Sequence, residues 1–118
     1  MTAESRHAIA EAQRNGAGVY VSPVSAWELA TLVARRRIQL ALEPEIWFGR
    51  MLALPGVRLA PMPPGVLIAS AFLPGTPPRD PADRIIAATG RAYGLAIVTR
   101  DGELVPYSQT GNISAILC

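Results

Sequence analysis

The sequence predicts one α/β domain with a mostly parallel central sheet. Helical and strand patterns alternate along its 118 residues, a length sufficient for one hydrophobic core. The segment "LAIVT" (95–99) is apolar throughout, which is typical of a strand buried on both faces of a parallel sheet. The chain shows no internal repeat and no linker-like composition, so we treat residues 1–118 as a single domain.

The first half alternates helix, strand and helix. Residues 3–15 are polar with a helical period and are followed by a glycine, whereas residues 18–22 ("GVYVS") are rich in strand-forming side chains. A second helix is expected over 23–37, because Ser22 can cap it, a proline takes the first helical position and three arginines close it. A third helix, 43–54, also has a proline near its start.

The second half follows the same rule. Residues 56–62 predict a strand that a proline ends, and "PPGVLIASAFLPG" (63–75) predicts a helix between proline breakers. The next helix, 81–93, stops before a glycine and leads into strand 95–99. Residues 112–118 suit a last strand, and the intervening loop, 101–111, is the least regular part.

Composition excludes several chemistries. Net charge is +2, and all eleven basic residues are arginine, which suits an anionic partner but equally fits a genomic composition bias. The lack of lysine excludes a P-loop and a Schiff base. His7 and Cys118, the single histidine and cysteine, cannot form a zinc cluster or a disulfide. With no long apolar run and no signal-peptide pattern at the N-terminus, we expect a cytoplasmic protein without a membrane span.

Carboxylates remain as the candidate chemistry. Glu28, Asp83 and Asp101 each fall near the place where a predicted strand ends or a helix begins, which is one rim of a parallel sheet. Oxygen ligands without His or Cys select Mg²⁺ or Mn²⁺. Each residue also has an ordinary structural explanation: Glu28 in a capping box, Asp101 in a turn, and Asp83 in the first turn of a helix that Asp80 caps. Jointly they favour a divalent-ion site.

Two motifs add a family resemblance. The stretches "VYVSPVSAWELATLVARRRIQL" and "DPADRIIAATGRAYGLAIVTRD" resemble PIN-domain proteins, and closely the VapC toxins of bacterial toxin–antitoxin pairs. Nearly the whole chain follows that family's order of elements. The resemblance implies a three-layer α/β/α fold and a nuclease that hydrolyses RNA phosphodiesters, usually in tRNA or rRNA. It also implies inhibition by a cognate antitoxin and assembly as a homodimer.

The same resemblance assigns roles to individual residues. It implies that Glu28, Asp83 and Asp101 bind Mg²⁺ or Mn²⁺. Asp80 matches a secondary acidic position, so we expect it to be the helix cap while Asp83 is the ligand. Thr99 matches a hydroxyl position near the site.

Family members also begin with an apolar strand that ends in an aspartate, and this chain starts after it. We therefore expect an N-terminally incomplete domain that lacks one carboxylate and a central strand. That departure leaves open a non-catalytic PIN module that binds the antitoxin or another partner. A nuclease acting on DNA is less favoured, and a receiver-type phosphoacceptor would need the absent lysine.

Three arginines border the predicted site. Arg79, Arg84 and Arg100 are candidates to contact RNA phosphates, although solvated surface charge explains them equally well. The two tryptophans, Trp27 and Trp47, are expected to pack in the core rather than to stack on bases. The apolar segments around "EIWFGRML" and "VLIASAF" exceed what a small domain can cover, which predicts self-association.

Overall fold

The computed structural model describes residues 2–99 and 103–117. In this part of the chain every predicted helix and strand is present, most of them with shorter ends, and one further short helix lies inside the predicted loop 101–111. The elements are α1 (Ala3–Arg14), β1 (Val19–Val21), α2 (Pro23–Ala34), α3 (Pro44–Leu52), β2 (Val57–Leu59), α4 (Pro64–Ala71), α5 (Pro81–Tyr93), β3 (Ala96–Thr99), α6 (Leu104–Ser108) and β4 (Ser114–Leu117).

The helix boundaries follow from local capping. The Ser22 hydroxyl accepts a hydrogen bond from the Val24 backbone N–H at 3.2 Å, so α2 starts where the sequence predicts. Asp80 caps α5 in the same way, since its Oδ1 accepts from the Asp83 N–H at 3.1 Å. Gly94 ends α5 with a left-handed φ of 64°, which glycine adopts without steric cost.

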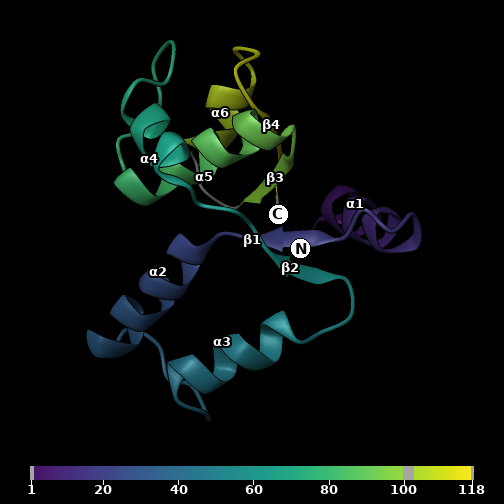
Figure 1. Cartoon of the computed structure of the whole chain (residues 1–118), viewed down its shortest axis with the longest axis vertical. Coiled ribbons are helices and arrows are strands. Elements are labelled where there is room, and N and C mark those ends of the chain that lie inside the picture. The colour runs from purple at the N-terminus through teal and green to yellow at the C-terminus, as the bar shows by residue number, and fades with distance from the viewer. Residues whose placement is uncertain (1, 100–102, 118) are drawn as a thin grey trace.

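The strands form two parallel pairs. β1 pairs with β2 from Val19↔Val57 to Val21↔Leu59, and β3 pairs with β4 from Ala96↔Ser114 to Thr99↔Leu117. The α/β class and the parallel pairing are thus confirmed, whereas within the described residues the two pairs are not joined into one sheet. Figure 1 shows β1 and β2 beside α2 and α3, while β3 and β4 lie with α4, α5 and α6.

The core lies in the half of the molecule that contains α5. Ala87 of α5, Ile97 of β3, and Leu104 and Tyr107 of α6 are buried against one another. The sequence did not predict α6, because five residues with a central proline give no helical period. Burial of Leu104 and Tyr107 stabilises this short helix by tertiary packing rather than by propensity.

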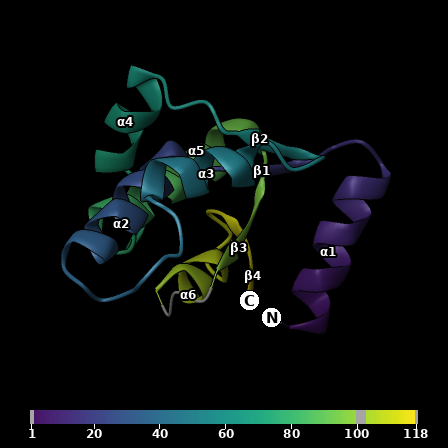
Figure 2. The same ribbon diagram turned by 90° about the horizontal axis from the view of Figure 1, so that it is seen from below.

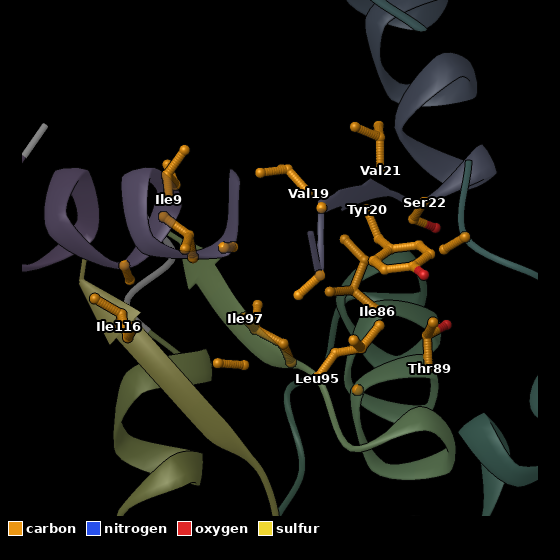
Figure 3. Close-up of a pocket in the computed structure, with 18 of the residues that line it drawn as sticks. Ile9, Val19, Tyr20, Val21, Ser22, Ile86, Thr89, Leu95, Ile97 and Ile116 are labelled. Carbon is orange, nitrogen blue, oxygen red and sulfur yellow. The ribbon is translucent and has the colours of Figure 1, made fainter. Parts of the chain in front are cut away.

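A cleft of about 450 Å³ separates the two strand pairs. Figure 3 shows side chains of α1, β1, α5 and β3 converging on it, among them Ile9, Val19, Ile86 and Ile97. At ~30 Å³ per water it could hold about 15 waters, far more than the voids of a packed interior. The expectation that strand 95–99 is buried on both faces is wrong, since Val98 borders this cleft and is 37% exposed.

Helices α2 and α3 pack against each other and extend away from the α5 core (Figure 1). Trp27 on α2 is 62% exposed and Trp47 on α3 is 38% exposed, so the prediction of core packing was wrong for both. Helix α2 also contacts α5 and α3 also contacts β2, but these neighbours leave Trp27 and Trp47 exposed. In the described ranges, no helix combines the length and apolar character that crossing a membrane requires.

Candidate functional site

Two of the three predicted metal ligands lie on neighbouring helices. Glu28 is in the second turn of α2, which follows β1, and Asp83 is the third residue of α5. Both side chains are half-buried. Helices α2 and α5 pack against each other, so residues 55 positions apart in the sequence are carried by adjoining elements. The α2–α5 contact is the feature of the fold that favours a shared site.

Asp80 and Asp83 divide their roles as the capping pattern predicts. Asp80 is exposed and uses Oδ1 to accept the Asp83 backbone N–H. Its carboxylate thereby satisfies one of the four unpaired N–H groups at the start of α5. The cap prediction is confirmed, and the ligand role of Asp83 stays a prediction.

The remaining predicted site residues lie at the end of β3. Thr99 is the last residue of that strand and is half-buried. Asp101 and Arg100 lie outside the described residues. Among residues 2–99 and 103–117, no group of three or more His, Cys, Asp or Glu side chains is placed to hold a metal ion. The predicted set needs Asp101 as its third member, so the set of three stays a prediction.

Two predicted RNA-contacting arginines take part in intramolecular contacts. The Arg84 Nε donates to the Pro78 carbonyl at 2.7 Å. The Arg79 side chain is 93% exposed, and its Nε lies 3.7 Å from Oε1 of Glu103. An ion pair this exposed contributes little to stability and is easily exchanged for another anion. Arg79 therefore faces solvent, whereas Arg84, on α5, is bonded to the backbone of the preceding loop.

Glu103 is a residue that sequence reasoning missed. Its Oε2 accepts the Arg79 backbone N–H at 2.8 Å, which joins the loop before α5 to the start of α6. Because the two residues are 24 positions apart, no local motif could reveal this contact.

The donor chemistry fits a hard divalent cation. Glu28 and Asp83 offer carboxylate oxygens, the ligands that Mg²⁺ and Mn²⁺ prefer. His7, the one histidine, is on α1 and pairs with Glu11 at 3.6 Å, and both side chains are largely exposed. Its place on a separate helix argues against a zinc-type ligand set for this site.

Comparison with known proteins identifies the family of the chain. The family model described as PIN domain matches residues 2–107. The chain is 38% identical over 84 residues to a protein named Ribonuclease VapC22 from Mycobacterium tuberculosis, an alignment that covers 71% of this chain and 63% of that protein. The chain thus spans somewhat less than two thirds of the length of this relative. No solved structure matches the chain at a significant level. Since the family model covers most of its residues, the chain belongs to the PIN domain family.

Proposed function

We propose that this chain is the catalytic part of a VapC-like endoribonuclease that hydrolyses RNA phosphodiester bonds with Mg²⁺ or Mn²⁺. The observation that carries the proposal is the contact between α2 and α5, which bear the half-buried carboxylates Glu28 and Asp83. The relative named as a ribonuclease supports the reaction class.

Glu28, Asp83 and Asp101 would hold the metal. When bound, such an ion lowers the pKa of a coordinated water and neutralises charge on the scissile phosphate. One of the three carboxylates would orient the attacking water and take up its proton. The Thr99 hydroxyl, at the end of β3, would hydrogen-bond a phosphate oxygen.

The basic residues would bind the RNA backbone. Arg79 is well placed for this role because its side chain is almost fully exposed. Arg100 and Arg84 are the other candidates, although the Nε of Arg84 is already bonded to the loop. A DNA substrate presents the same phosphates, so these contacts alone do not select RNA.

We extend the proposal to the substrate class and the partners. We propose a tRNA or rRNA target, a cytoplasmic location and inhibition by a cognate antitoxin. Large apolar side chains are exposed on α2, on α3 and on or beside α4, and exposed apolar surface marks interfaces. They include Trp27, Ile46, Ile68 and Phe72, with exposures of 62%, 48%, 63% and 81%. We propose that this surface forms a homodimer interface, an antitoxin interface or both.

A specific observation also favours the second candidate, a non-catalytic PIN module. The cleft lies between β1 and β3, and among the described residues each of these strands pairs on one side only. We propose that a parallel strand joined to the start of α1 belongs in this cleft, so that the domain described here is incomplete. In both views the start of α1 lies beside the carboxyl end of β4, where such a strand would finish (Figures 1 and 2).

The test is cleavage of total tRNA and of rRNA fragments with Mg²⁺, with EDTA as the metal-free control. The ribonuclease proposal predicts discrete fragments that appear only with Mg²⁺ and are lost in Asp83→Asn. Matched single-stranded DNA should stay intact, and preferential DNA cleavage would favour a deoxyribonuclease. No cleavage of any substrate by a folded protein that still binds its antitoxin would favour the non-catalytic module.

A further inference from the structure

The loop that leads into α5 is hydrogen-bonded at both of its ends, once to α6 and once to Glu103, the residue before α6. At one end, the Tyr107 hydroxyl donates to the Pro74 carbonyl at 2.6 Å. At the other, Oε2 of Glu103 accepts the Arg79 backbone N–H at 2.8 Å. The two side chains that make these bonds are four residues apart, so both ends of the loop 74–79 are held by the same short segment, residues 103–107.

The segment 103–107 is held in place by the core. Tyr107 is 2% exposed and Leu104 is 1% exposed, and both pack against Ala87 of α5 and Ile97 of β3. The backbone of Glu103 directly precedes this buried helix, although its own side chain is partly exposed. The Glu103 contact is therefore a link between the rigid core and the backbone immediately before α5.

The hydrogen bond and the ion pair that Glu103 makes with Arg79 differ in how firmly they hold the loop. Its ion pair with the Arg79 guanidinium is 3.7 Å long, with side chains 43% and 93% exposed, so it holds little in place. The backbone hydrogen bond is shorter and charge-assisted, which makes it the stronger of the two. Arg79 directly precedes Asp80, whose Oδ1 holds the Asp83 N–H. A continuous chain of hydrogen bonds and one peptide unit thus runs from Glu103 to Asp83.

We propose that Glu103 is a positioning residue for the Asp83 carboxylate. It fixes the backbone at Arg79, and through Asp80 it fixes the first turn of α5, which carries Asp83. We call the link from Glu103 to the first turn of α5 the tether. Its effect on metal binding rests on the proposed function, whereas the tether itself rests on the contacts described above. The role needs an acceptor oxygen more than a charge.

The test compares Glu103→Ala, which removes the acceptor, with Glu103→Gln, whose amide oxygen can still accept the N–H. Glu45→Ala, at an exposed position of α3, is the matched control. Amide hydrogen exchange of Arg79 and Asp83, followed by NMR, measures how well these two backbone N–H groups are protected, and it needs no metal. We expect exchange about tenfold faster in Glu103→Ala, the value that ~1.4 kcal/mol of lost hydrogen bonding gives, and a much smaller change in the other two variants.

The second readout is Mn²⁺ affinity, measured from the electron paramagnetic resonance signal of free Mn²⁺. Losing a group that orients a metal ligand typically weakens metal binding by 10-fold or more, so we expect about tenfold weaker affinity in Glu103→Ala alone. Unchanged exchange at Arg79 in that variant would overturn the tether. Faster exchange with unchanged Mn²⁺ affinity, or equal weakening in Glu103→Gln, would overturn the positioning role. A parent chain that binds no Mn²⁺ would instead overturn the proposed metal site, and the exchange data would then decide the tether by themselves.

Discussion

Helix α5 lies close to the segment that leads into β3 at Gly90. A Cβ added at Gly90 would lie 3.0 Å from Cδ1 of Ile97 and 3.1 Å from the carbonyl oxygen of Leu95. The isoleucine can rotate away, but the carbonyl oxygen moves only if the backbone shifts. Alanine favours a helix over glycine by ~1 kcal/mol, whereas overpacking costs ~1–3 kcal/mol. We therefore expect Gly90→Ala to lower the free energy of unfolding by about 1 kcal/mol.

Gly49 provides the matched control, because it lies inside α3 and an added Cβ would meet nothing within 4 Å. Gly49→Ala should gain the higher helix propensity of alanine without a packing cost, and so raise the free energy of unfolding by ~1 kcal/mol. The same chemical change should thus separate the two variants by about 2 kcal/mol, or about 8 °C in melting temperature. Urea unfolding followed by circular dichroism measures the difference. A Gly90→Ala variant as stable as Gly49→Ala would refute the close contact between α5 and β3.

Three further results are expected. Tyr107→Phe removes the hydroxyl that donates to the Pro74 carbonyl and should lower the free energy of unfolding by ~1–2 kcal/mol in the same assay. An unchanged unfolding midpoint would show that this hydrogen bond does not stabilise the protein. Sedimentation at micromolar concentration should show a dimer or larger species, and Ile68→Ser with Phe72→Ser should shift it toward monomer because both side chains are exposed apolar groups on or beside α4; a monomeric parent would contradict the proposed interface. An apolar strand joined ahead of α1 should raise both the melting temperature and Mg²⁺-dependent RNA cleavage by filling the cleft, and an extension that changes neither would argue against that strand position.

Much of the fold could be predicted because its signals are local. The caps at Ser22 and Asp80 and the glycine at 94 mark helix ends by chemistry that acts within three residues. The alternation of helices with apolar strands likewise predicted parallel pairing.

Other features depend on contacts between distant segments and left no local trace. The α6 helix exists because Leu104 and Tyr107 enter the core, and Glu103 meets Arg79 across 24 positions. The exposure of Trp27 and of Val98 reflects which neighbours surround α2 and β3, a property that neither residue's own segment encodes. For the candidate site, the sequence named the carboxylates, and the α2–α5 contact shows that two of them lie on adjoining helices.

The most direct test of the central claim is Mn²⁺ affinity of Asp83→Asn against Asp80→Asn. The two carboxylates lie three residues apart on the same helix start, but Asp80 serves as the cap and asparagine caps a helix about as well as aspartate. The proposed site predicts that Asp83→Asn weakens Mn²⁺ binding at least about tenfold, since removing one anionic oxygen ligand costs more than 1.4 kcal/mol, while Asp80→Asn stays near the parent value. Equal affinity in the two variants, or a larger loss in Asp80→Asn, would contradict the assignment of Asp83 as the metal ligand.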